Sequence, residues 1–192
     1  MADLQQRLNQ VEEIIKKPAF RENKGLSNEV GYYIFDYPAD QELIVRERVK
    51  KIIKKHEKGT YGFKLVVFDL YELIISILIE KNFLNKCCDF EKTKGFEYIT
   101  RSIESAFRFT GEKNLLVEHV QNNTPDNSVV FLTGVGKCYP ILRSHNILNN
   151  LHQAMDKVPV VMFYPGKYDK QELILFSELK DQNYYRAFKL VD

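Results

Sequence analysis

Four short apolar runs recur along the chain, and segments with helical periodicity separate them. The runs are residues 32–35, 65–68, 128–133 and 158–163. A continuous apolar run of this length is typical of a strand that is covered on both faces. Strands that alternate with helices form βαβ units, in which the strands are parallel. The sequence therefore predicts a three-layer α/β fold, with a mostly parallel sheet and helices on both faces.

The segments between the apolar runs supply the predicted helices. Apolar residues three or four apart indicate an N-terminal helix that ends before Pro18, and Asp40 is placed to cap the helix after the first strand. Helices are predicted at residues 4–15, 40–56, 71–80, 142–155 and 171–179. A last strand is predicted at residues 185–191. We expect one α/β domain, residues 1–192, in which residues 82–127 are a mainly helical insertion.

Composition excludes several classes of protein. The 28 Lys and Arg residues nearly balance the 26 Asp and Glu residues, and a net charge of +2 gives little overall attraction to nucleic acid. No apolar run approaches the roughly 18 residues of a membrane helix, and the N-terminus lacks an apolar signal segment. The 3 cysteines include no CxxC pair, which argues against a disulfide framework or a zinc site. We expect a cytoplasmic protein with reduced thiols and no membrane partner.

Asp36 and Asp69 each end a predicted strand. Ligands of open α/β sheets bind at the carboxyl ends of the strands, and carboxylates on two adjacent strands can hold Mg²⁺. The common role of Asp at such a position is to cap the following turn or helix. Without a DxD, HxH or HExxH pattern, the sequence predicts no metal site and no cofactor.

The segment 131–138 matches the P-loop pattern GxxxxGK[ST] only in part. Phe131 stands where the first glycine belongs, and Cys138 stands where the Mg²⁺-binding hydroxyl belongs. We therefore predict no ATP hydrolysis. Phosphate binding without hydrolysis, by the turn and its lysine, is an alternative that stays open. Its residues are Thr133, Gly134, Gly136 and Lys137.

His145 is a candidate general base, because histidine titrates near neutrality. Its neighbour Ser144 points in a different direction on a helix, and Cys138 is the other nucleophile nearby. No GxSxG elbow is present. The alternative is a hydrogen-bonding histidine near a turn or an interface, and we expect no catalytic residue and no enzyme activity.

A row of basic side chains lies on the helix predicted at residues 40–56. Arg46, Lys50 and Lys54 are four residues apart and share one helix face. Such a row can neutralise phosphates of a nucleic acid. It can equally be a solvated helix face.

Several blocks of the sequence resemble the BrxB family, which is encoded in BREX bacteriophage-exclusion loci. The blocks are residues 33–37, 42–46, 131–140, 142–145, 148–151, 162–168, 175–176 and 183–188. The resemblance spans nearly the whole chain and is weakest at residues 82–127. It implies a role in phage exclusion and in the linked host-DNA methylation, with no established catalytic activity.

The resemblance also implies protein partners from the same locus. They are the alkaline-phosphatase-like protein PglZ, for which we expect direct binding, the ATPase BrxC and the methyltransferase PglX. Tyr and Arg are favoured interface anchors, and the partner-binding candidates are Tyr139, Pro140, Arg143, His145, Tyr168 and Tyr184. Arg186 shares a strand face with apolar residues, so we expect Asp36 or Asp69 to pair with it. A nucleotide-binding regulator and a nucleic-acid adaptor are the alternatives to this assembly role.

Overall fold

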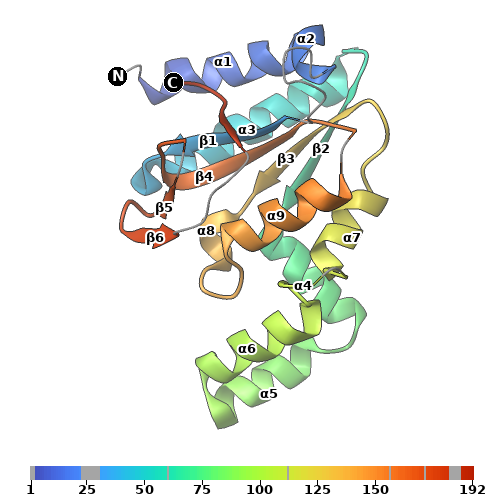
Figure 1. Ribbon diagram of the computed structural model, residues 1–192, viewed down its shortest axis with the longest axis vertical. Coiled ribbons are helices and arrows are strands. Elements are labelled where there is room, and N and C mark those ends of the chain that lie inside the picture. The colour runs from blue at the N-terminus through green and yellow to red at the C-terminus, as the bar shows by residue number, and fades with distance from the viewer. Residues whose placement is uncertain are drawn as a thin grey trace.

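The computed structural model describes residues 3–22, 31–59, 61–111, 113–155, 157–170, 172–181 and 187–192. A mostly parallel sheet has helices on both faces, which confirms the predicted three-layer α/β fold (Figure 1). The parallel strands lie in the order β2-β3-β4-β1-β7. Their bounds are β1 (Tyr32–Tyr37), β2 (Lys64–Asp69), β3 (Ser128–Thr133), β4 (Val160–Tyr168) and β7 (Phe188–Lys189). The four apolar runs thus become β1 to β4, and β2 lies at one edge.

Helices α1, α2 and α3 cover one face of the sheet, and α4, α7, α8 and α9 cover the other (Figure 1). The first layer consists of α1 (Leu4–Lys16), α2 (Pro18–Arg21) and α3 (Glu42–Lys58), with the 3₁₀ turn η1 (Ala39–Gln41) before α3. The second consists of α4 (Leu70–Glu80), α7 (Leu115–Asn122), α8 (Val135–Cys138) and α9 (Ser144–Ala154). None of the described helices is long and apolar enough to cross a membrane.

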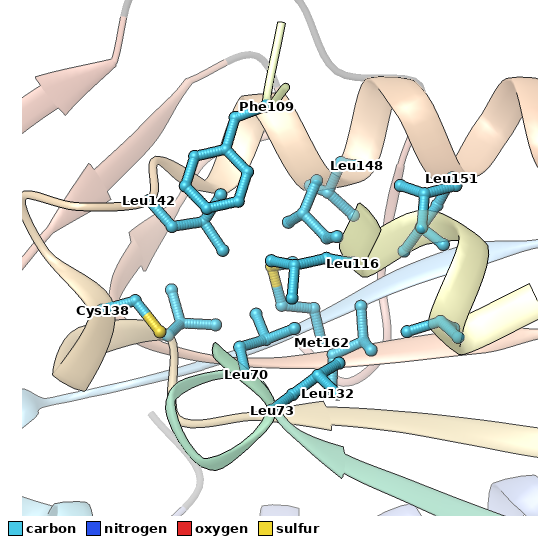
Figure 2. Close-up of a cluster of buried hydrophobic side chains, with 14 of the residues drawn as sticks. Leu70, Leu73, Phe109, Leu116, Leu132, Cys138, Leu142, Leu148, Leu151 and Met162 are labelled. Carbon is cyan, nitrogen blue, oxygen red and sulfur yellow. The ribbon is translucent and has the colours of Figure 1, made fainter. Parts of the chain in front are cut away.

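The alternation of side chains along each strand builds a separate core on each face. Val129 and Phe131 of β3 pack toward α1 and α3, whereas Val130 and Leu132 pack toward α4, α7 and α9. Figure 2 shows the second core, where Leu132 lies among leucines of the covering helices. Complete burial of one such side chain contributes roughly 1.5–3 kcal/mol, so both layers are held chiefly by this packing.

Helices α5 (Leu84–Lys94) and α6 (Phe96–Phe107) lie at the end of the molecule away from the sheet (Figure 1). Helix α6 buries Ile99, Ile103 and Phe107, which are four residues apart, whereas α5 has no buried residue. The pair therefore joins the second core along one face of α6.

The segment 171–179 is not the predicted helix. Its described residues belong to an antiparallel hairpin that continues from β4, with strands β5 (Leu173–Leu175) and β6 (Leu179–Asp181). Leu173 and Leu175 are buried and two residues apart, which is the spacing of a strand. Leu175 pairs with Gly166 of β4. Tertiary pairing thus overrides the helix propensity of this segment.

Two predicted boundaries are also wrong. Within the described residues the last strand is only Phe188–Lys189, which pairs with β1, and residues 185–186 of the predicted strand lie outside the described residues. Asp40 does not cap α3, because Pro38 leads into the 3₁₀ turn η1 and the helix begins only at Glu42. The backbone N–H of Gln41 donates to the Pro38 carbonyl at 2.9 Å and closes that turn.

The buried Asp36 carboxylate joins four segments at the carboxyl end of β1. Its Oδ1 accepts from Arg7 of α1 at 2.7 Å, and its Oδ2 accepts from the Tyr168 backbone N–H at 3.0 Å. The Nζ of Lys189 lies 3.4 Å from the same Oδ2, and Arg7 also donates to the Val191 carbonyl at 3.2 Å. Asp36 therefore pairs with Arg7 and Lys189, while Arg186 lies outside the described residues.

We expect the Asp36→Ala substitution to lower the free energy of unfolding by about 3–5 kcal/mol, because it leaves a buried guanidinium without its carboxylate. The side chains of Asp36 and Arg7 are only 9% and 14% exposed. Urea denaturation measures the effect. The control is Glu47→Ala, which removes an exposed pair with Lys50 and should change stability by less than about 0.5 kcal/mol. Equal unfolding midpoints for the two variants would contradict this role of Asp36.

Candidate functional site

The carboxyl ends of the parallel strands meet at one edge of the sheet, which is the usual ligand edge of an α/β fold. Asp36 ends β1 and Asp69 ends β2, but β3 and β4 lie between these two strands. A shared Mg²⁺ ion would require the two carboxylates to lie on adjacent strands, and they do not. Within the described ranges, no group of three or more His, Cys, Asp or Glu side chains could hold a metal ion.

Asp69 and Gly134 are fitted to each other at the ends of β2 and β3. The Asp69 Oδ1 caps α4, accepting from the backbone N–H groups of Tyr71 at 3.1 Å and Glu72 at 3.2 Å. Gly134 has a φ of 75°, and a Cβ at this position would collide with the Asp69 carboxylate. Only glycine meets both conditions without strain, so the Gly134 turn fixes the place of this carboxylate.

Lys137 extends from α8 toward the same carboxylate. Its Nζ lies 2.7 Å from Asp69 Oδ2 and 3.4 Å from Glu72 Oε1, and it stands over the Tyr71 ring at 5.4 Å. Two acidic neighbours thus hold the lysine at the carboxyl edge of β2 and β3. The sequence indicates Lys137 and Asp69 as separate candidates but does not predict their pairing, which depends on β2 lying beside β3, nor the contact with Glu72 of α4.

Arg46 of α3 is oriented by a hydrogen-bonded chain that begins in the core. The buried Tyr37 hydroxyl donates to Glu42 Oε2, and Arg46 Nε donates to Glu42 Oε1 at 2.7 Å. Burial, together with the hydrogen bond to Glu42, raises the pKa of Tyr37, so the phenol stays protonated and donating. The i, i+4 spacing of Glu42 and Arg46 is the sequence signal for this pair.

The Lys137–Asp69 pair and the Arg46–Glu42 pair line one cavity of about 270 Å³ between α3 and the strand ends, here called the α3 cavity. Its polar wall has Glu42, Arg46, Lys50, Asp69, Thr133, Gly134 and Lys137, and its remaining lining is Tyr37, Val45, Val49, Ile53, Val67 and Phe163. The structure therefore joins residues that the sequence had assigned to separate phosphate-binding and nucleic-acid-binding candidates.

Two of those candidate residues do not line the α3 cavity. A Cβ at Gly136 would meet Phe176 and Pro165 at 3.0 Å, so this glycine permits close packing of α8 against the β5–β6 hairpin. Lys54 is exposed on α3 beyond the cavity. The predicted basic row is thereby divided, because Arg46 and Lys50 line the cavity and Lys54 does not.

A second hollow of about 200 Å³, here called the hairpin hollow, lies between the loop that follows α8 and the β5–β6 hairpin. Its lining is Tyr139, Arg143, Ser144, Tyr164, Leu175, Glu178, Leu179 and Lys180. Tyr139, Phe176 and Leu179 are each 38% exposed, and the rings of Tyr139 and Phe176 make an edge contact at 6.4 Å. Pro140 and Arg143 are exposed beside them and His145 is half-buried.

Tyr168 does not belong to this surface. It is 2% exposed, and its hydroxyl donates to the Ala187 carbonyl at 2.6 Å. Its assignment to a partner surface is therefore wrong, because the ring lies in the second core. Tyr184, another partner-binding candidate, lies outside the described residues.

Cys138 is placed as a core residue rather than as an exposed nucleophile. Cys138 is buried within the second core (Figure 2), and its thiol donates to the Gly134 carbonyl at 3.3 Å. Burial and the nearby Asp69 charge raise the pKa of Cys138 to about 12. The thiol is therefore neutral at physiological pH, and Ser144 is buried as well.

Comparisons with known proteins agree on one family. A family model described as "BREX protein BrxB" matches residues 66–190. A BREX protein BrxB from Bacillus cereus (strain H3081.97) is 47% identical over 192 residues, which is 100% of both chains. A BREX protein BrxB from Escherichia coli O9:H4 (strain HS) is 34% identical over 188 residues, or 98% of this chain and 92% of the relative. No solved structure gave a significant match.

We expect thiol labelling to separate the cysteines. The raised pKa of Cys138 keeps its thiol protonated at pH 8 and burial blocks access to it, so a maleimide should label Cys138 only after unfolding in urea. The exposed Cys88 serves as the internal control and should react within minutes in the native protein. Mass spectrometry of peptides locates the label. Equal native labelling of Cys88 and Cys138 would restore Cys138 as a candidate nucleophile.

Proposed function

The chain belongs to the BrxB family of BREX proteins, and on that premise we propose that it is a non-catalytic assembly subunit that binds the PglZ-like protein of its own locus. Membership in the family makes it a subunit of a phage-defence system. The proposed complex would support phage exclusion and the linked methylation of host DNA.

The exposed aromatic surface at the hairpin hollow is the single observation that carries this proposal. Tyr139 and Phe176 lie in edge contact, Leu179 lies on the neighbouring β6, and all three are more than a third exposed. Single exposed apolar residues are ordinary, but a contiguous group with a charged rim is typical of a protein interface. Arg143, Glu178 and Lys180 supply that rim.

The residues at this surface are also unnecessary for the core beneath them. The core on this side is filled by Leu142, Ile147 and Leu148, which are nearly fully buried. Tyr139, Pro140 and Arg143 lie in the loop between α8 and α9 and point away from that core. Loops on a rigid scaffold commonly carry binding residues, which supports a contact role for these side chains.

We expect Arg143→Glu to reduce co-purification with PglZ at least about tenfold, because repulsion adds to the loss of an interfacial charge pair. The melting temperature should stay within a few degrees, since Arg143 is exposed. Co-expression followed by affinity and size-exclusion chromatography measures the complex.

The matched control is Arg101→Glu, a charge reversal on the remote and exposed α6. It should leave PglZ binding unchanged. Absence of a complex between the parent chain and PglZ, or equal loss of binding in both variants, would refute the proposed partner or the proposed surface. Parallel pull-downs with BrxC and PglX identify which protein of the locus binds if PglZ does not.

A further inference from the structure

We propose that the α3 cavity binds a small organic phosphate of the size of a nucleoside monophosphate. Arg46 and Lys137 would hold the phosphate, and the apolar lining would hold the organic group. This site is separate from the hairpin hollow, so the inference does not depend on PglZ binding.

Arg46 is exposed, but its contact with Glu42 orients its guanidinium at the cavity. Only the Nε of Arg46 donates a hydrogen bond to Glu42, and among the described residues its two Nη groups have no hydrogen-bond partner. The buried Tyr37 hydroxyl in turn holds Glu42. A guanidinium fixed through Nε presents a pair of parallel N–H donors, which is the arrangement that binds two oxygens of a phosphate.

Lys137 on the opposite wall and Lys50 on α3 add two further cations. Asp69 and Glu72 fix the Lys137 ammonium but leave it a third donor hydrogen. Lys50 makes only an exposed pair with Glu47 at 3.2 Å, and such pairs contribute little. The lining thus has three cations against the carboxylates Glu42 and Asp69, with Glu72 just outside it beside Lys137, so the free donors of Arg46 and Lys50 rather than a net charge would attract an anion.

The remaining lining favours an organic anion over free phosphate. Ile53 and Val67 are half-buried, and Val45, Val49 and Phe163 lie beneath them. A largely apolar cavity with a few convergent polar groups is typical of a small-molecule site. Its volume of about 270 Å³ is just below the range of about 300–1,000 Å³ for such sites, which suits a monophosphate better than a triphosphate.

The Thr133 hydroxyl completes the polar wall. It donates weakly to the Phe68 carbonyl at 3.5 Å and keeps its lone pairs for a ligand hydroxyl. The site thus differs from a P-loop, since Arg46 on α3 supplies the main phosphate contact and Gly136 packs against the hairpin instead.

Isothermal titration calorimetry of the full chain tests the proposal with the four ribonucleoside monophosphates, and with adenosine and inorganic phosphate as the separate halves of AMP. At least one monophosphate should bind with a Kd below about 1 mM and at least tenfold more tightly than either half, because each half makes only part of the contacts. Failure of all four monophosphates to bind at this concentration overturns the proposal, as does equal affinity for inorganic phosphate.

Two variants test the two halves of the site. Arg46→Gln removes the phosphate contact from an exposed position, and Ile53→Phe fills the cavity without changing its charge. Each should weaken monophosphate binding at least about tenfold, or about 1.4 kcal/mol. Both should keep the parent's circular dichroism and its co-purification with PglZ.

Lys54→Gln is the matched control, because it removes a charge from the same helix outside the cavity. It should bind the monophosphate as the parent does. Equal weakening by Lys54→Gln and Arg46→Gln would mean general attraction to a basic helix and would overturn the site. Binding to a single-stranded oligonucleotide but to no monophosphate would overturn it in favour of a nucleic-acid surface.

Discussion

The parallel pairing of β1 with β4 is the constraint on which the rest of this molecule depends. Because β3 and β4 lie between β1 and β2, the connection from β1 to β2 must cross two strands, and α3 makes that crossing. Right-handed crossovers fix which face it takes. The first turns of α3 consequently lie over the carboxyl ends of β3 and β4, opposite the Gly134 turn, and this position creates the α3 cavity.

Asp36 and Asp69 occupy equivalent strand ends but have different physical roles. Asp36 is buried, and it links α1, β4 and the C-terminal segment to β1 through Arg7, Tyr168 and Lys189. Asp69 is partly exposed, and it caps α4 while positioning Lys137 at the edge of the cavity. Asp36 therefore stabilises the fold, whereas Asp69 holds Lys137 at a position that a ligand can reach.

The three-layer arrangement could be predicted from the sequence because parallel strands that are buried on both faces consist of continuous apolar runs. The sequence failed for residues 171–179, where pairing with the end of β4 decides the conformation and local propensity does not. It also marked Arg46 and Lys137 as unrelated candidates, because only the strand order brings α3 to the turn after β3. Tyr168 shows the same limit, since an aromatic residue alone does not reveal whether it faces a core or a partner.

Helix α8 and the residue that follows it contribute to the α3 cavity and to the hairpin hollow, respectively. Lys137 reaches the cavity, while Tyr139, two residues later, faces the hollow. Gly136 and Cys138, which flank Lys137, pack against Phe176 of the hairpin and against the second core. A substitution at either position would therefore displace Lys137 and Tyr139 together. Arg46 and Arg143 belong to separate elements, α3 and the loop before α9, so they are the positions at which ligand binding and partner binding can be separated physically.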